Sequence, residues 1–180
     1  MKLTRRQLLV RGALASGGLL ISSALLRYGW FLKAMPRAGL HVFSTREVEI
    51  LESLLLTLFP GAEGMPPADV ERLVPNLDAF LAQNENDSRT AFRAMLHVID
   101  DHSRFFHLKR FVDLDPETRA QEVRAWELTT IYLEKTAFRS VKLLVGMQYM
   151  EQPDVRDALG WYLGCSPSHL APSRIGGAGV

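Results

Sequence analysis

The stretch that decides the fold is Ser44-Thr45-Arg46-Glu47-Val48-Glu49-Ile50-Leu51-Glu52-Ser53-Leu54-Leu55-Leu56-Thr57-Leu58, residues 44–58. Its apolar residues recur at spacings of three and four, which predicts an amphipathic helix. Ser44 and Glu47 have the spacing of a capping box, with Phe43 placed as the hydrophobic staple. Ile50 and Leu56 widen the apolar stripe, so we expect this helix to be buried on more than one side.

Helical periodicity continues beyond this stretch. A second helix is expected to follow the Pro- and Gly-rich loop 60–67, and Pro75 should kink it or start a new helix after Val74. A third helix, capped by Asp87 or Ser88, should lead into a connector at 103–114. Asp115-Pro116 predicts another helix start, with the pattern running to about residue 150 and Thr129-Thr130 as the place where it would break. Pro153 should open a short helix that ends at Gly160.

These patterns predict an all-α protein, a small helical bundle without strands or repeats. Between the predicted helices the sequence shows no alternation of apolar and polar residues that would indicate hairpins. The expected core comes from the apolar stripes of the helices and comprises Leu51, Leu54, Leu55, Leu58, Leu77, Phe80, Phe92, Leu96, Trp126, Leu133, Val141 and Leu144.

The N-terminus carries an export signal. Thr4, Arg5 and Arg6, followed by Leu8 and Leu9, have the pattern of a twin-arginine signal. The apolar run from Gly12 to Leu26 would be about 22 Å long as a helix, short of the roughly 30 Å hydrocarbon core of a bilayer. We therefore expect delivery to the periplasm by the twin-arginine translocase. A plain membrane anchor, an ordinary signal peptide and an uncleaved signal helix remain alternatives.

The sequence divides into three parts. Residues 1–37 form the export segment, residues 38–164 an all-helical domain, and residues 165–180, rich in Ser, Pro, Gly and Ala, a flexible tail. The export segment holds seven Lys and Arg and no acidic residue, whereas the rest of the chain holds 14 basic and 20 acidic residues, a net charge of −6. An acidic body argues against a nucleic-acid-binding protein, which needs a clustered positive face.

Residues with catalytic or metal-binding chemistry are few. The single cysteine, Cys165, excludes an internal disulfide and a Cys-x-x-Cys-His haem attachment. His97 and Asp101 are four residues apart and would share a helix face, but no third metal ligand stands at a useful spacing. Asp100 and Asp101 diverge by about 100° on a helix, which is typical of surface residues. We expect no catalytic residue, no metal site and no cofactor in this chain.

Several short motifs, taken in order, suggest a family. After the twin-arginine leader come Leu58-Phe59-Pro60, Arg110-Phe111 with Leu114, Trp126, Phe138-Arg139 with Lys142, and Tyr149 with Pro153 ahead of Gly160. Over about residues 1–165 this order resembles the gluconate 2-dehydrogenase subunit 3 family, which includes the small subunits of bacterial FAD-dependent glucose dehydrogenases. The resemblance implies a non-catalytic small subunit that escorts a folded, FAD-containing catalytic subunit of the glucose-methanol-choline type. It also implies a multihaem cytochrome c as a further partner.

Apolar residues outside the apparent core are the candidates for contact with a partner. They are Phe105, Phe106, Phe111, Tyr149, Trp161 and Tyr162, although these aromatics would equally complete the core. A lone cysteine in an exported chain also suggests an intermolecular bridge, which makes Cys165 a candidate for a disulfide with the large subunit. The alternative to an escort subunit is a free-standing exported helical protein that binds a small ligand or a metal.

Overall fold

The computed structural model describes residues 33–62 and 64–160. The predicted export residues Thr4, Arg5, Arg6, Leu8 and Leu9, the candidate contacts Trp161 and Tyr162, and Cys165 lie outside these residues.

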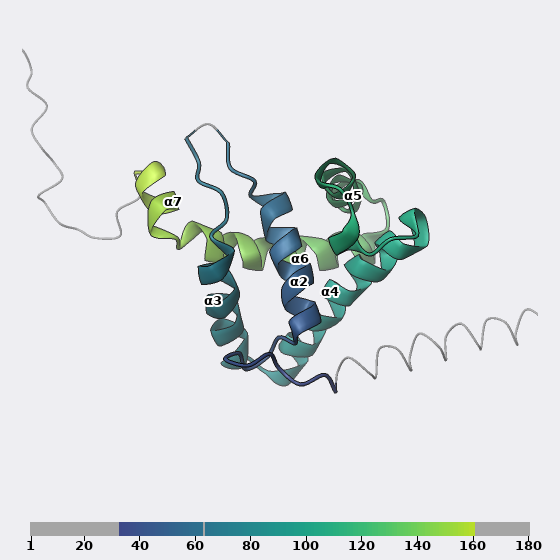
Figure 1. Ribbon diagram of the computed structural model, residues 1–180, viewed down its shortest axis with the longest axis horizontal. Helices are drawn as coiled ribbons and strands as arrows, with labels where there is room; N and C mark the ends of the chain where they lie inside the picture. The colour runs from purple at the N-terminus through teal and green to yellow at the C-terminus, as the bar shows by residue number, and fades with distance from the viewer. Residues whose placement is uncertain (1–32, 63, 161–180) are drawn as a thin grey trace, which may run out of the picture.

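The described chain is all-α, as predicted, and residues 33–62 and 64–160 contain no strand. Figure 1 shows the helices in chain order, joined by short turns except for the loop after the first of them. Their bounds are α2 (Thr45–Leu58), α3 (Val70–Ala82), α4 (Asn86–His107), the 3-10 turn η1 (Phe111–Asp113), α5 (Pro116–Leu128), α6 (Tyr132–Met150) and α7 (Pro153–Ala158).

Helix α2 is the central element of the fold. It begins with the predicted capping box, because the backbone N–H and the hydroxyl of Ser44 both donate to Glu47 Oε2, at 2.7 and 2.8 Å. In Figure 1 it crosses the middle of the molecule, and it contacts α3, α4, η1 and α5. Ile50, Leu51 and Leu54 have no exposed surface, which confirms the widened apolar stripe at Ile50, but Leu56, expected to widen it as well, is 45% exposed.

Helices α3 and α4 differ from the prediction at their ends and at a proline. Helix α3 continues through Pro75, which lies in its second turn, so it neither stops nor restarts after Val74. Helix α4 begins at Asn86, with Glu85 rather than Asp87 or Ser88 as its N-cap residue. It also runs on to His107, so most of the connector expected at 103–114 is helix and η1 instead.

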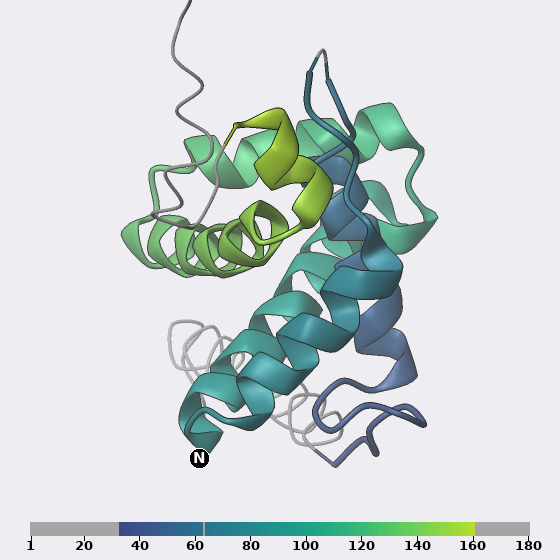
Figure 2. The same cartoon turned by 90° about the vertical axis from the view of Figure 1, so that its left-hand side faces the viewer.

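The C-terminal half begins and breaks where the sequence indicates. Asp115 accepts a hydrogen bond from the Thr118 backbone N–H at 3.0 Å, and Pro116 occupies the first helical position. The chain leaves the helical conformation between α5 and α6, at the Thr129-Thr130 step. Figure 2 shows α6 with α7 beside it, at the edge of the molecule away from α2.

The core matches the prediction at eight of its twelve residues, which are buried: Leu51, Leu54, Leu55, Leu77, Phe92, Leu96, Trp126 and Val141. Leu58 and Leu144 are partly buried against it. The prediction is wrong for Phe80, 39% exposed, and for Leu133, 77% exposed. The prediction is wrong for Leu133 because the chain leaves the helical conformation before α6, and this break rotates α6 relative to α5. The apolar stripe that contains Trp126 in α5 therefore faces outward at the start of α6.

Buried carboxylates fix the positions of the helices. Asp78 of α3 accepts three backbone N–H bonds, from His41, Val42 and Phe43, at 2.7 to 2.9 Å. These bonds anchor the segment before α2 to α3. A carboxylate with no exposed surface is tolerated only where such donors replace water.

The adjacent aspartates Asp100 and Asp101 are not both surface residues. Asp100 is fully buried, contrary to the prediction, and accepts hydrogen bonds from the Phe111 backbone N–H at 3.1 Å and from Arg46 at 2.6 Å. His97, expected at a solvated helix end, is also buried, 3.2 Å from Glu47. Local sequence could not predict the contacts of Asp100 and His97. Their partners Arg46 and Glu47 lie 50 or more residues away, and a further partner of Asp100 is a backbone N–H of another segment.

Candidate functional site

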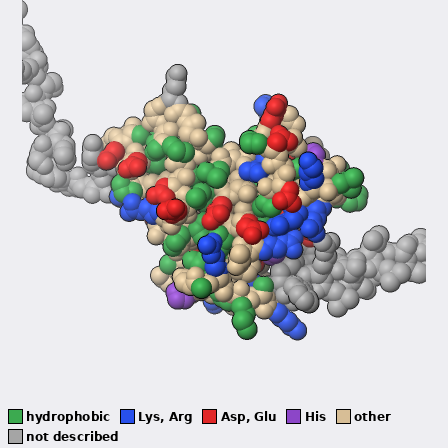
Figure 3. All heavy atoms as spheres, viewed as in Figure 1, with side chains coloured by type: hydrophobic (Ala, Val, Ile, Leu, Met, Phe, Trp, Pro, Cys, Tyr) green, Lys and Arg blue, Asp and Glu red, His purple; other side chains and the backbone are tan. Residues whose placement is uncertain are grey.

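Large apolar side chains stay exposed on α6 and on the residues next to it in the chain. Eight of them belong to residues 128–159, which we call the α6 face: Leu128, Ile131, Tyr132, Leu133, Leu143, Met147, Met150 and Leu159. By contrast, the face seen in Figure 3 carries acidic and basic side chains side by side. Such a concentration of exposed apolar residues is typical of a binding surface.

The end of α4 extends this apolar surface. Phe105 is 80% exposed and Phe106 is 63% exposed, and their rings meet edge to face with centroids 5.2 Å apart. Leu108, which ends α4, is also exposed and has a φ of 55°, in the left-handed region that leucine rarely adopts. The structure therefore places Phe105 and Phe106 where a partner can reach them.

Two other predicted contact residues are core residues instead. Phe111 has no exposed surface and lies beneath Arg119, whose guanidinium carbon is 5.8 Å from the ring centroid. Tyr149 is also buried, against Phe59. Both aromatics complete the core, which was the alternative left open by the sequence.

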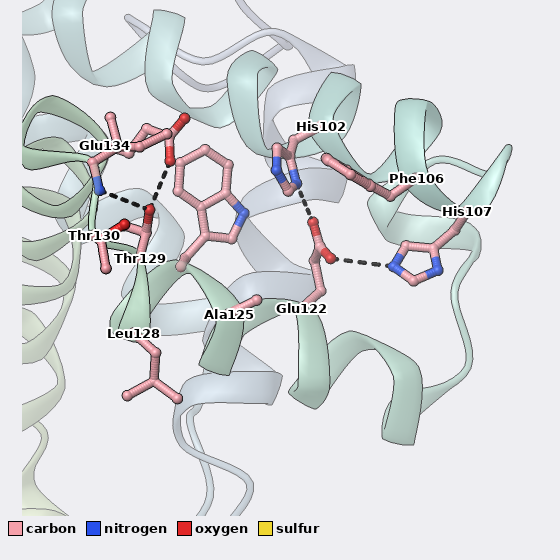
Figure 4. A pocket seen from close by; sticks show the side chains of 11 residues that line it. His102, Phe106, His107, Glu122, Ala125, Leu128, Thr129, Thr130 and Glu134 are labelled. Carbon is pink, nitrogen blue, oxygen red and sulfur yellow. Dashed lines mark hydrogen bonds and ion pairs between the residues drawn. The ribbon is translucent and has the colours of Figure 1, made fainter.

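Two histidines share one buried carboxylate beside the exposed phenylalanines. His102 Nδ1 contacts Glu122 Oε1, and His107 Nε2 lies 3.2 Å from Glu122 Oε2. In Figure 4 the two imidazoles stand on either side of Glu122, which reaches from α5 toward α4. The Ser103 hydroxyl also donates to Glu122, at 3.4 Å. No local pattern in the sequence indicates this cluster, because its glutamate is 15 to 20 residues from its histidines.

A pocket of about 570 Å³ opens beside this cluster. Its walls come from α4, α5 and the first turn of α6, and include Phe106, Trp126, Leu128 and Ile131. Its volume falls within the roughly 300–1,000 Å³ of typical ligand pockets. Chemically, the Glu122 carboxylate orients both imidazoles, and the aromatic walls offer a flat apolar side chain or molecule a place to stack. Because Phe106, Leu128 and Ile131 line the same pocket, it joins the end of α4 to the α6 face.

A second hollow, which we call the α6–α7 groove, lies at the other end of α6. It has a volume of about 650 Å³ and is lined by Arg139, Lys142, Leu143, Gly146, Met147, Met150, Glu151 and Arg156. Its floor is apolar, because Leu143 is 67% exposed and Met147 is 52% exposed. The charged residues Arg139, Lys142, Glu151 and Arg156 also line it.

Among residues 33–62 and 64–160, no group of three or more His, Cys, Asp or Glu side chains is arranged to hold a metal ion. No helix in the described part of the chain is long and apolar enough to cross a membrane.

Comparison of the chain with protein-family models, with curated proteins and with solved structures finds no match.

Proposed function

We propose that this protein is the non-catalytic small subunit of a periplasmic flavin-dependent dehydrogenase complex. It supplies the twin-arginine signal for a folded, FAD-containing large subunit and stabilises that subunit by binding it. The substrate is oxidised in the large subunit, and a multihaem cytochrome c takes up the electrons.

The observation that carries this proposal is the unpartnered apolar surface formed by the α6 face and the end of α4. Phe105, Phe106 and Ile131 expose more than half of their surface. A passenger held without covalent bonds must stay bound throughout transport, which favours an extensive and partly apolar contact, on the order of 2,000 Å² or more. The exposed apolar residues supply the kind of surface that such a contact needs.

The export signal gives the proposal its physical reason. The twin-arginine route carries folded proteins, and the signal residues Arg5 and Arg6 precede a helical body in which we find no motif for a cofactor. A flavin bound without a covalent bond would be lost if its protein were unfolded for transport. A signal on a small escort subunit lets the loaded subunit cross in its folded state.

The first experiment tests the escort role. In the native host, Arg5→Lys and Arg6→Lys together should leave both this protein and the flavoprotein in the cytoplasm, with the flavoprotein still active. Lysine keeps the charge but lacks the planar guanidinium fork that the pair presents. The readout is flavin absorbance and dehydrogenase activity in the periplasmic and cytoplasmic fractions. A flavoprotein that still reaches the periplasm contradicts the proposal.

The second experiment tests the surface. The double change Phe105→Ser and Phe106→Ser should reduce the amount of flavoprotein that purifies with this protein by at least about tenfold, since central aromatic contacts contribute about 2 kcal/mol or more each. Phe80→Ser, on α3, is the control, because Phe80 is 39% exposed but belongs neither to the α6 face nor to the end of α4. It should leave the flavoprotein bound. Equal recovery of the flavoprotein with both variants would show that Phe105 and Phe106 are not part of the interface.

The pocket at Trp126 favours a second candidate function. A free-standing exported protein would use this pocket of about 570 Å³ to bind a small flat molecule beside His102 and Glu122. The two functions can be distinguished by the mass of the purified protein and by what is bound to it. An escort subunit purifies with a flavoprotein, whereas a ligand-binding protein purifies as a monomer with a small molecule bound.

A further inference from the structure

The α6–α7 groove is an apolar hollow that no described side chain fills. Leu143, Met147 and Met150 all expose more than a third of their surface along its floor. The groove residue Lys142 pairs with Glu127, on the neighbouring helix. The groove is therefore suited to an uncharged apolar segment lying along α6.

The described structure ends at Gly160, four residues after Arg156, which lines this groove. Helix α7, which carries the groove residue Arg156, is held against α6 by the fully buried Val155. It ends at Ala158, and Gly160 follows with a φ of 64°, a left-handed conformation that glycine adopts without strain. The next residues in the sequence are Trp161-Tyr162-Leu163, an uncharged apolar triplet, and 20 residues follow Gly160 in all.

Simple geometry lets the triplet reach the groove. Gly160 is four residues after Arg156, or about 6 Å along a helix. Three further residues span up to about 10 Å of extended chain. The groove residues from Arg139 to Met150 extend over about 16 Å of α6, so Leu163 can reach the middle of the floor.

The triplet is joined to the groove by only a few residues, which favours it over other occupants. A segment joined to its site by a few residues experiences an effective concentration of about 1 mM or more. A weak apolar contact with a dissociation constant of about 100 µM would then be occupied roughly ten to one within the same molecule. A partner in solution matches that occupancy only at millimolar concentration or with much higher affinity.

We propose that Trp161-Tyr162-Leu163 folds back onto the α6–α7 groove and covers Leu143 and Met147. This contact does not depend on the proposed function, whose partner surface keeps the end of α4 and the α6-face residues outside the groove, such as Ile131. It makes the groove an internal docking site for the C-terminal segment of the same chain.

The test is the accessibility of Trp161 in the full-length protein. The chain has three tryptophans, so the emission of Trp161 is obtained as the difference between the wild type and Trp161→Phe. We expect blue-shifted emission and poor quenching by iodide in the wild type. Met147→Asp, which places a charge on the groove floor, should raise the quenching constant of Trp161 by up to about tenfold, in line with the ten-to-one occupancy.

Leu133→Asp is the matched control. Leu133 lies on the same helix and is 77% exposed, but it does not line the groove, so this change should leave Trp161 protected. Far-ultraviolet circular dichroism checks that both variants keep their helices.

Three results would overturn the inference. Quenching of Trp161 in the wild type as strong as that of free tryptophan amide would show that the segment is undocked. Protection that grows with protein concentration assigns the groove to a second copy of the chain. Protection that appears only in the complex with the flavoprotein assigns it to that partner.

Discussion

Phe59 and Tyr149 stack face to face, with ring centroids 4.1 Å apart and planes only 7° from parallel. Phe59 is the C-cap residue of α2, and Tyr149 lies in the last turn of α6. The Tyr149 hydroxyl also donates to the Pro66 carbonyl, at 2.5 Å. One side chain thus holds the end of α2 and the loop that follows it against α6.

Removing the Tyr149 hydroxyl should cost stability without changing the fold. Tyr149→Phe keeps the stacked ring and should lower the free energy of unfolding by about 0.5–1.5 kcal/mol, since it leaves only the hydrogen bond unmade. Tyr149→Ala should lower it by about 3–5 kcal/mol, because the stacked ring is lost as well. Urea unfolding measures both. Tyr132→Phe is the control, because Tyr132 is exposed, and its effect should be close to zero.

The adjacent aspartates Asp100 and Asp101 should differ sharply. Asp100→Ala removes the buried acceptor of Arg46 and of the Phe111 backbone N–H and should cost about 3–5 kcal/mol of unfolding free energy. Asp101→Ala removes long ion pairs to Arg46 and Arg104, at 3.9 and 4.0 Å, and should cost less than about 1 kcal/mol. Thermal unfolding of the two variants side by side gives the comparison. Equal losses would show that Asp100 does not anchor η1.

Glu47 should make the protein sensitive to acid. Burial by itself would raise the pKa of Glu47, but hydrogen bonds from His97, Arg93 and Ser44 outweigh it and hold the pKa below its ordinary value of 4.5. A lowered folded-state pKa contributes stability above the pKa of the unfolded chain, and this contribution is lost as the pH falls through the folded value.

The unfolding free energy of the wild type should therefore fall between about pH 5 and pH 3. Glu47→Gln should be less stable at neutral pH and should show a shallower decline over that range. Glu71→Gln, which changes an exposed glutamate, should follow the wild type. If the unfolding free energy of Glu47→Gln falls with pH as steeply as that of the wild type, other carboxylates cause the acid sensitivity.

Cys165 should form a disulfide with the large subunit in the exported complex. An unpaired thiol in an oxidising compartment tends to find a partner, and this chain offers no second cysteine. Electrophoresis without reductant should show a band at the summed mass of the two subunits. The band should collapse on reduction and be absent in Cys165→Ser. Two separate bands, together with labelling of Cys165 by a thiol reagent, would exclude the bridge.

The predictions from sequence succeed where the signal is local. The Ser44 capping box, the Asp115-Pro116 start and the break at Thr129-Thr130 depend on neighbouring residues, and the structure confirms each of them. The errors concern residues whose environment is set by distant segments. Phe80 has the periodicity of a core residue, but no helix covers it completely.

The candidate site was predicted only in part for the same reason. Phe105 and Phe106 are exposed as a binding surface requires, yet nothing in the local sequence distinguishes them from Phe111, which η1 turns into the core. The cluster at Glu122 joins α4 to α5, so no spacing within one helix could reveal it.

The central position of α2 has a consequence for synthesis on the ribosome. Its apolar residues, such as Leu51 and Leu54, emerge before every helix that covers them, and the cover supplied by α5 begins only at Pro116. At about 5–20 residues per second, the nascent chain carries this uncovered helix for several seconds. Stalling translation between residues 60 and 115 would thus leave α2 without its full cover and prone to aggregate, so the timing of elongation through α3 and α4 becomes part of how this protein folds.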